Sequence, residues 1–155
     1  MSSRPRAAVQ ADWLQLDRQL CFALYAASLA MTKLYKPLLE PLGLTYPQYL
    51  AMLSLWEHDG LGVSDLGERL QLDSGTLTPL LKRLEAAGFV QRLRDTTDER
   101  RVRVQLTPAG RALKTRARAV PESIARASGC GLDEIAALTA RLHSLREQIV
   151  QATPA

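Results

Sequence analysis

The sequence predicts a mainly α-helical protein with one small β-hairpin. Apolar residues recur in steps of three and four over long segments near both ends, a spacing typical of amphipathic helices. Two shorter amphipathic segments follow each other in the middle, and directly after them apolar and polar residues alternate, as in strands. With 155 residues and 46% hydrophobic side chains, the chain is expected to form a single domain over residues 8–151.

A long helix is predicted over residues 12–40, and Pro41 with Gly43 is expected to end it. Its apolar positions are Trp13, Leu20, Leu24, Ala27, Met31, Leu34 and Leu38. Cys21 falls well inside this predicted helix, and Tyr35 follows fourteen residues later, about 21 Å further along and within roughly 40° of the same face. A contact between this thiol and this phenol therefore requires the tyrosine of a second, antiparallel chain.

A second helix is predicted over residues 47–58. Thr45 is placed to cap it, and Pro47 is tolerated in its first turn. The segment 59–62, which contains two glycines, is expected to break the chain direction after this helix.

Two short helices then follow in quick succession. Ser64 is expected to cap a helix that ends at Leu70, and Asp73 or Ser74 is expected to cap another that ends at Ala87. Because only three residues separate these helices, they form a helix-turn-helix pattern.

The second helix of this pair has the composition of a DNA-reading helix. Small and hydroxyl residues at its start, followed by two cations, suit the major groove. The side chains expected to face outward are those of Ser74, Gly75, Thr76, Thr78, Pro79, Lys82 and Arg83.

Two strand-like runs come next, over residues 89–94 and 101–106, and they bracket a polar tip over residues 95–100. A hairpin directly after a reading helix is a wing. An arginine at its tip could reach a minor groove, where the negative potential favours that side chain.

The C-terminal part is predicted to be helical. Thr107 and Pro108 begin a helix that runs toward the mid-120s, and residues 129–131 interrupt it. A last helix follows, with the apolar stripe Ile135, Leu138, Leu142, Leu145 and Ile149. Together with the N-terminal helix, this stripe can form either an intramolecular bundle or a dimer seam.

Positive charge is concentrated in one segment. The whole chain carries +4, whereas residues 82–118 hold eleven Lys and Arg against four acids, a net +7. Such a distribution is typical of a protein that binds a polyanion. We expect Lys82, Arg83, Arg94 and Arg101 to contact phosphate, and Thr76, Thr78 and Arg100 to read the sequence. The cations from Arg111 to Arg118 are expected to form a solvated helix face.

Other classes of protein are poorly supported. No apolar run of eighteen residues and no signal-peptide region is present, so we expect a cytoplasmic protein without a membrane partner. Two cysteines in such a compartment are unlikely to form a constitutive structural disulfide. His58 and His143 do not stand at ligand spacing from a cysteine or from each other, so we expect no metal and no cofactor.

The order of these elements, together with the runs at residues 73–85 and 98–101, resembles the MarR family of winged-helix repressors. The setting of Cys21, the Leu-Thr-Tyr at residues 44–46 and the Asp-Ser-Gly-Thr-Leu-Thr-Pro run at residues 73–79 resemble its organic-hydroperoxide-sensing branch, the OhrR type. The resemblance covers roughly residues 10–150.

This resemblance implies a homodimer that binds palindromic double-stranded operator DNA until an organic hydroperoxide, the inducer, oxidises a thiol. The family's reactive thiol falls on Cys21, and the two tyrosines that hydrogen-bond it from the other subunit fall on Tyr35 and Tyr46. Cys130 matches the resolving cysteine of a two-cysteine subgroup, in which oxidation yields an intersubunit disulfide.

The resemblance also divides the chain. Residues 46–107 would form the DNA-binding winged-helix lobe, and residues 12–40 and 108–150 the dimerisation helices. The family's groove-reading helix maps to residues 74–83 and its wing-tip arginine to Arg100.

Two alternatives remain open at this stage. The same fold could be released from DNA by reversible binding of a small phenolic or aromatic ligand. A thiol peroxidase would be an enzyme of another class, but nothing in the chain resembles a peroxidase scaffold, and we expect no enzymatic activity.

Overall fold

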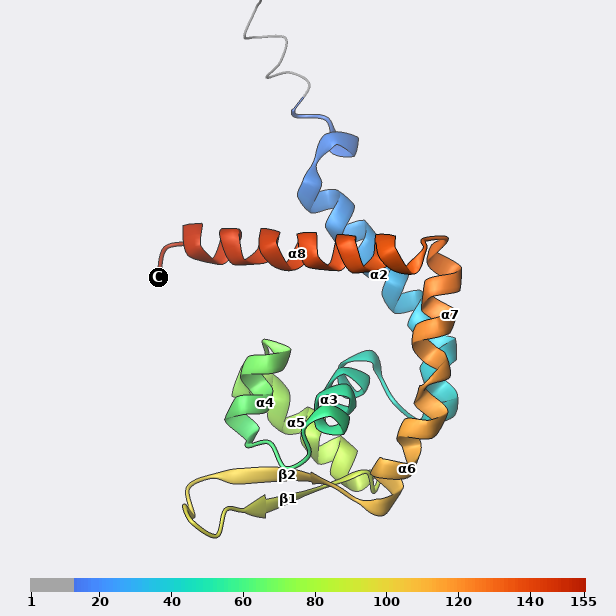
Figure 1. Ribbon diagram of the computed structural model, residues 1–155. Coiled ribbons are helices and arrows are strands. Elements are labelled where there is room, and N and C mark those ends of the chain that lie inside the picture. Colours follow the sequence, from blue (N-terminus) through green and yellow to red (C-terminus); the bar gives the residue numbers. More distant parts are fainter. Residues whose placement is uncertain (1–12) are drawn as a thin grey trace, which may run out of the picture.

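Helices make up most of residues 13–155, the part of the chain that the computed structural model describes (Figure 1). A single two-stranded antiparallel sheet accompanies them. The predicted fold class, mainly α with a small β-hairpin, is therefore confirmed. In chain order the elements are η1 (Leu16–Arg18), α2 (Leu20–Leu39), η2 (Glu40–Leu42), α3 (Tyr46–Glu57), α4 (Val63–Leu70), α5 (Ser74–Ala86), β1 (Val90–Arg94), β2 (Val102–Leu106), α6 (Pro108–Ala117), α7 (Ala119–Ser128) and α8 (Leu132–Ala152).

The N-terminal helix starts later than predicted. Residues 13–15 are not helical, η1 is a short 3-10 turn, and Gln19 is extended (φ −82°, ψ 117°), so α2 begins at Leu20. The Gln19 side chain donates to the Gln15 carbonyl at 3.1 Å and also to the Trp13 carbonyl, which holds the preceding segment in this turn. The prediction that Cys21 lies well inside a helix is therefore wrong. Residues 8–12, where the predicted domain and helix begin, lie outside the described residues.

The start of α3 follows its sequence signals. Thr45 and Gln48 form a reciprocal capping box, in which each side chain bonds the other residue's backbone amide. Helix α3 then runs through the core, where Tyr49, Met52 and Leu55 are almost fully buried. It therefore forms the centre against which the helix-turn-helix and α2 pack.

The helix-turn-helix consists of α4 and α5. Ser64 does not cap α4, contrary to the prediction, because Gly62 is the extended residue whose carbonyl accepts the Leu66 amide. Gln71 ends α4 in the left-handed region (φ 59°), and the Asp73 side chain caps α5 by accepting the Thr76 amide at 2.8 Å. The inner face of α5 carries the buried side chains Leu77, Leu80, Leu81 and Leu84.

The hairpin has the predicted strands and a defined register, with Val90 opposite Leu106 and Arg94 opposite Val102. The Val104 amide donates to the Leu61 carbonyl at 2.8 Å, so the hairpin is anchored to the segment just before α4. Gly88, at the turn from α5 into β1, has φ 84°, a value that glycine adopts without strain.

The C-terminal region contains one more helix break than predicted. Instead of one helix to the mid-120s, α6 ends at Ala117 and α7 begins at Ala119. In a continuous helix the Ala117 carbonyl would accept from the backbone nitrogen of residue 121, but that residue is Pro121, which has no N–H. The chain then turns at Gly129, and α8 projects away from α7 (Figure 1).

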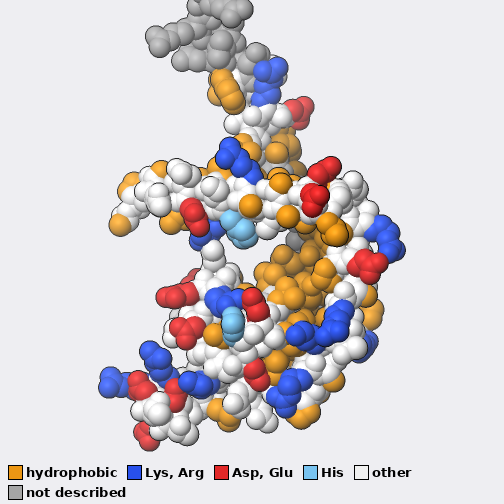
Figure 2. Space-filling view, viewed as in Figure 1, with side chains coloured by type: hydrophobic (Ala, Val, Ile, Leu, Met, Phe, Trp, Pro, Cys, Tyr) orange, Lys and Arg blue, Asp and Glu red, His pale blue; other side chains and the backbone are white. Residues whose placement is uncertain are grey.

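Helix α8 is 21 residues long, and none of its residues is buried. Its exposed large apolar side chains include Leu138, Leu142, Ile149 and Val150. Figure 2 shows hydrophobic side chains gathered in the hollow between α8 and the helix-turn-helix below it. Within residues 13–155, no helix has the combined length and apolar character that crossing a bilayer requires.

Candidate DNA interface and thiol site

Helix α5 presents the predicted DNA-reading residues on its outer face. Ser74, Gly75, Thr76, Pro79, Lys82 and Arg83 are exposed, and Thr78 is half-buried. The capping hydrogen bond from the Thr76 amide lowers the pKa of Asp73, so this carboxylate stays charged while it fixes the first turn of α5. This capping bond holds the first turn of α5, which is the part of the helix predicted to contact base edges.

Asp95 organises the tip of the wing. Its carboxylate accepts from the Thr97 amide at 3.0 Å, from the Thr97 hydroxyl at 2.8 Å and from Arg103 Nε at 3.1 Å. These bonds, those from Thr97 above all, lower the pKa of Asp95 to about 2. The tip therefore holds Arg100, whose side chain is 96% exposed, and Arg101 out in solvent. Figure 2 shows Lys and Arg side chains at this end of the molecule.

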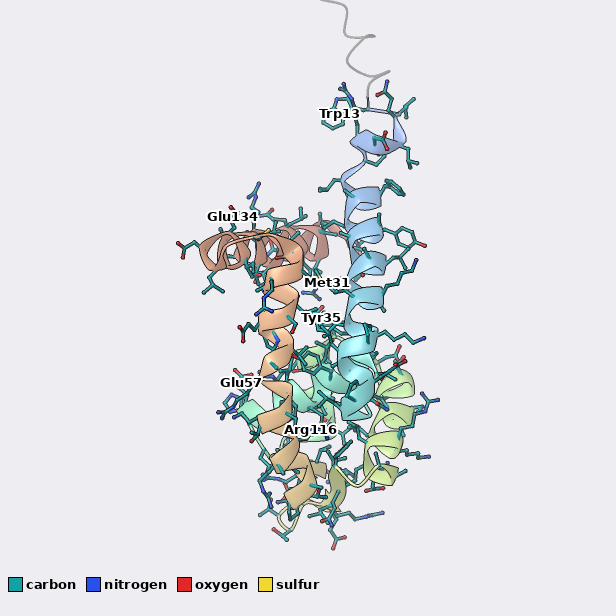
Figure 3. The ribbon with its side chains drawn as sticks, turned by 90° about the vertical axis from the view of Figure 1, so that its right-hand side faces the viewer. Trp13, Met31, Tyr35, Glu57, Arg116 and Glu134 are labelled. Atoms are coloured by element: carbon teal, nitrogen blue, oxygen red, sulfur yellow. The ribbon has the colours of Figure 1, made fainter. Side chains whose placement is uncertain are left out.

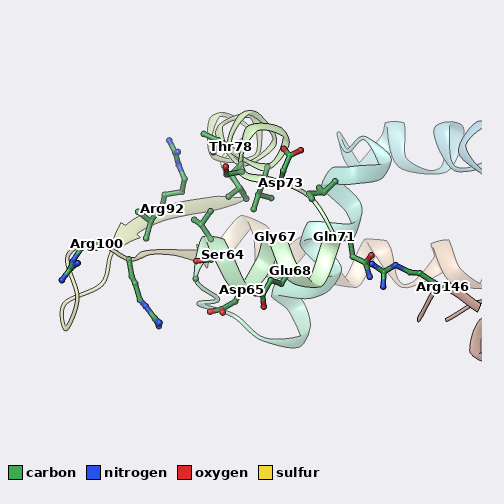
Figure 4. Close-up of a pocket in the computed structure, with 18 residues that line it drawn as sticks. Ser64, Asp65, Gly67, Glu68, Gln71, Asp73, Thr78, Arg92, Arg100 and Arg146 are labelled. Atoms are coloured by element: carbon green, nitrogen blue, oxygen red, sulfur yellow. The ribbon is translucent and has the colours of Figure 1, made fainter. Parts of the chain in front are cut away.

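A groove of about 920 Å³ lies between α4, the first turns of α5 and the wing. Ser74, Thr78, Arg100 and Arg101 line it, so the structure brings these four predicted DNA contacts together (Figure 4). Arg146 from α8 also reaches its edge. Lys82 and Arg83 lie further along α5, and Arg94 lies on β1.

Several cations of the basic segment already have partners. Arg92 pairs with Glu85, and Arg103 pairs with Asp95. Arg111 donates to the Leu106 carbonyl at 3.0 Å, and Arg116 donates to the Pro41 carbonyl at 2.7 Å. Both residues nevertheless stay exposed together with Lys114 and Arg118, so the predicted solvated helix face is confirmed. Local spacing does not predict these pairings, because each joins residues from different segments of the chain.

The two thiols lie in different settings. Cys21 is exposed at the second position of α2, while Cys130 is half-buried between Gly129 and Gly131. The Cys130 amide donates to the Ser128 hydroxyl at 3.2 Å. Both cysteines are free thiols in this structure.

Three tyrosines form an aromatic cluster where α2 meets α3. The ring centroid of Tyr35 lies 4.7 Å from that of Tyr46 and 5.8 Å from that of Tyr49. Burial, followed by the neighbouring phenols, raises the pKa of Tyr35 to about 12. At neutral pH the Tyr35 phenol carries its proton, as tyrosine ordinarily does, and can donate a hydrogen bond.

The cluster is remote from Cys21 of the same chain. Cys21 is in the first turn of α2 and Tyr35 in its fifth, so about 21 Å of helix separates them. The structure thus places the two predicted tyrosines together but not with the thiol. Figure 3 shows Tyr35 where α2 lies beside the rest of the protein, while the start of α2 extends beyond it. Tyr49, the third tyrosine of the cluster, is buried in the core.

The described residues offer no evident metal centre. Within residues 13–155, no three or more His, Cys, Asp or Glu side chains are grouped so that they could hold an ion.

The comparisons with known proteins agree with this geometry. The model of a family described as the MarR family matches residues 44–102. The chain is 52% identical over 138 residues to the HTH-type transcriptional regulator TtmR of Methylorubrum extorquens, covering 89% of this chain and 71% of that protein. It is 49% identical over 140 residues to the organic hydroperoxide resistance transcriptional regulator of Bacillus subtilis, covering 90% of this chain and 95% of that protein.

Solved structures of AbfR, a Staphylococcus epidermidis protein, have the same fold. Reduced AbfR bound to DNA superposes with a TM-score of 0.74 at 35% identity, covering 91% of this chain and 99% of that one. A disulfide-formed AbfR superposes with a TM-score of 0.62 at 33% identity, covering 94% and 99%.

Proposed function

Since the chain belongs to the MarR family of DNA-binding transcriptional regulators, we propose that it is a repressor that leaves its operator when an organic hydroperoxide oxidises Cys21. Members of this family are regulators and not enzymes, in agreement with the sequence-based expectation. The observation that carries the proposal is the contact of Tyr35, on the helix that bears the exposed Cys21 thiol, with Tyr46 of α3.

The proposal requires a homodimer. Exposed apolar side chains on α8, and Leu20, Phe22, Leu29 and Met31 on α2, support one, because a second copy would remove them from water. In an antiparallel pairing of two α2 helices, the Tyr35 and Tyr46 of one subunit approach the Cys21 of the other. Residues 46–107 then act as the DNA-binding lobe, and the helices in 12–40 and 108–150 join the subunits.

The chemistry begins with the Cys21 thiolate, which is the nucleophilic form of cysteine. The sulfur attacks one peroxide oxygen, the O–O bond breaks, and the products are a sulfenic acid on Cys21 and an alcohol from the peroxide. The first turn of α2 favours negative charge through the helix dipole, and phenol donors favour it through hydrogen bonds.

Cys130 completes the reaction in this proposal. Its thiol attacks the sulfenic sulfur of the partner subunit's Cys21, water leaves, and an intersubunit disulfide forms. The glycines on both sides of Cys130 support the movement this requires. A disulfide-formed state exists for the similar protein AbfR.

Release from DNA follows from geometry. A dimeric regulator places its two reading helices in successive major grooves of a palindromic operator, about 34 to 36 Å apart. Reorientation of α2 and α8 on oxidation changes this spacing, and both half-sites can no longer be contacted together.

The test combines a gel shift on the operator with a non-reducing gel. The wild type is expected to bind when reduced, to release DNA after treatment with an organic hydroperoxide, and to run as a covalent dimer. Cys21→Ser should bind DNA and ignore the peroxide, while Cys130→Ser should lose the covalent dimer. Undiminished binding of the oxidised wild type, or a peroxide response in Cys21→Ser, overturns the proposal.

A cavity of about 440 Å³ between α2 and α3 favours a second candidate function. Leu39, Leu44, Tyr46 and Pro47 give it an apolar lining, and Lys33 and Lys36 lie at the same cavity. These features suit a small phenolic or aromatic anion that releases the repressor reversibly. Under this alternative, the ligand releases DNA from a variant in which Cys21 and Cys130 are both serine, and it must fail to do so if thiol oxidation is the only input.

A further inference from the structure

The Glu85 carboxylate connects the reading helix α5 to the wing through two hydrogen bonds. In the last turn of α5, the Glu85 carboxylate accepts the backbone amide of Arg92 at 2.9 Å and the Arg92 guanidinium at 3.3 Å. Arg92 lies on β1, two residues before the exposed Arg94. A single carboxylate therefore fixes both the path of the first wing strand and the side chain on it.

Arg92 lines the groove between α5 and the wing, but its guanidinium is engaged with Glu85. Its side chain is only 29% exposed, and its Nε is buried without a hydrogen-bond partner. Opposite it on β2 is Val104, which is fully buried. Arg92 thus differs from Arg94, Arg100 and Arg101, which are exposed.

The rest of the connection is also fixed. The Phe89 amide donates to the Leu84 carbonyl at 3.0 Å, and the Thr107 hydroxyl donates to the Gly88 carbonyl at 2.5 Å. The bonds from Arg92, the backbone one above all, lower the pKa of Glu85, so its carboxylate is charged at neutral pH. Among these bonds, those of the Glu85 carboxylate are the ones that reach a residue of β1 itself.

We propose that Glu85 and Arg92 are positioning residues that set the wing relative to the reading helix, so that both elements engage the operator together. Neither residue touches DNA in this proposal. It depends on the DNA binding that the family shares, and not on the thiol chemistry proposed above.

The proposal reverses a simple electrostatic expectation. Glu85 is an acid within the basic segment 82–118, so neutralising it should strengthen attraction to a polyanion. If Glu85 holds the wing, its neutralisation weakens binding instead. Glu99 is a matched control, because it is an exposed acid at the wing tip and its change to glutamine alters the net charge equally.

The experiment measures operator affinity over a range of salt concentrations for Glu85→Gln and Glu99→Gln, under reducing conditions. We expect Glu85→Gln to weaken binding about tenfold, the order expected when hydrogen bonds to a charged group are lost. The salt slope should stay unchanged, because no phosphate contact is removed. Glu99→Gln should bind as tightly as the wild type or more tightly. Equal affinity of the two variants overturns the proposal.

Two further measurements separate positioning from general instability. Hydroxyl-radical footprinting of Glu85→Gln should show weakened protection where the wing contacts DNA, with protection by the reading helix retained. Equal weakening at both places overturns the proposal. Both Arg92→Lys and Arg92→Gln keep the backbone bond to Glu85, but only the lysine keeps a cation beside the carboxylate. Arg92→Lys should therefore retain most of the affinity, and Arg92→Gln should lose part of it with the salt slope of the wild type. If Glu85→Gln does not fold, Arg92→Gln decides alone, and wild-type affinity or a reduced salt slope in that variant overturns the proposal.

Discussion

The indole nitrogen of Trp56 donates a hydrogen bond to the backbone carbonyl of Gly110 at 2.9 Å. This bond joins the end of α3, the helix before the helix-turn-helix, to the first turn of α6, the helix after the wing. Gly110 also approaches the chain that enters β1, since a Cβ atom at this position would lie 2.1 Å from the Phe89 carbonyl oxygen. The DNA-binding lobe and the C-terminal helices therefore meet at a position that has no room for a side chain.

Gly110→Ala should destabilise the protein by about 1 to 3 kcal/mol, because the added methyl group must displace backbone rather than a flexible side chain. Urea denaturation followed by circular dichroism measures the loss. Gly131→Ala is the control, since its Cβ meets nothing within 4 Å and its φ is −69°. A similar loss in both variants would contradict the close approach at Gly110.

The hydrogen bonds to Asp95 should make the wing sensitive to acid. A carboxyl group whose pKa is about 2 when folded and near 3.8 when unfolded stabilises the folded state above pH 3.8, and this contribution is lost as the pH falls toward 2. Thermal melts between pH 5 and pH 2 should therefore show a smaller pH dependence for Asp95→Asn than for the wild type. Identical curves would show that Asp95 is not the titrating group.

Lys82 and Thr76 should affect DNA binding in different ways. Lys82→Ala is expected to weaken binding to all sequences and to reduce the salt slope by about 1, since one phosphate contact is lost. Thr76→Ala should leave that slope unchanged and relax the preference among operator variants, because a base-edge contact carries the specificity. Fluorescence anisotropy with a set of operator variants measures both. A changed salt slope in Thr76→Ala would reverse its assigned role.

The tyrosine cluster should be visible in an alkaline titration. The Tyr35 phenol, with its pKa raised to about 12 from 10.0, stabilises the folded state below pH 10, and this contribution is lost as the pH rises through 12. Ultraviolet absorbance of phenolate should show late ionisation whose amplitude falls by one phenol in Tyr35→Phe, while Tyr46 and Tyr49, whose pKa values are also raised by burial, account for the rest. Tyr25→Phe, which changes an exposed tyrosine on the same helix, should retain the full late amplitude. A smaller late amplitude in Tyr25→Phe would contradict the assignment.

Local signals in the sequence predicted most of the middle of the chain, although not the start of α4, where Gly62 and not Ser64 is the N-cap. The caps at Thr45 and Asp73, the break at residues 59–62 and the alternation after Gly88 each depend on neighbours within a few residues, and the structure has them all. The apolar face of α5 also follows from its spacing, because a helix brings every third or fourth residue to one side.

Features that depend on other elements were not predictable in this way. The apolar spacing before Leu20 is helical, yet the Gln19 side chain stabilises a turn there, and so Cys21 lies at a helix start. The contacts of Glu85 with Arg92, and of Trp56 with Gly110, join residues whose proximity arises only from folding. The sequence identified the basic segment but could not show which of its arginines pair with acids, as Arg92 does with Glu85 and Arg103 with Asp95.

Because α8 is long, a small change in its angle where it follows α7 moves its far end by several ångströms. A helix of 21 residues is about 32 Å long, so a rotation of about 5° at its base moves its far end by about 3 Å, the size of a hydrogen bond. That base is the segment of residues 129–131, in which Cys130 stands between two glycines. A small rotation at residues 129–131 therefore becomes a large displacement of the far end of α8, and Cys130 lies at the point of rotation.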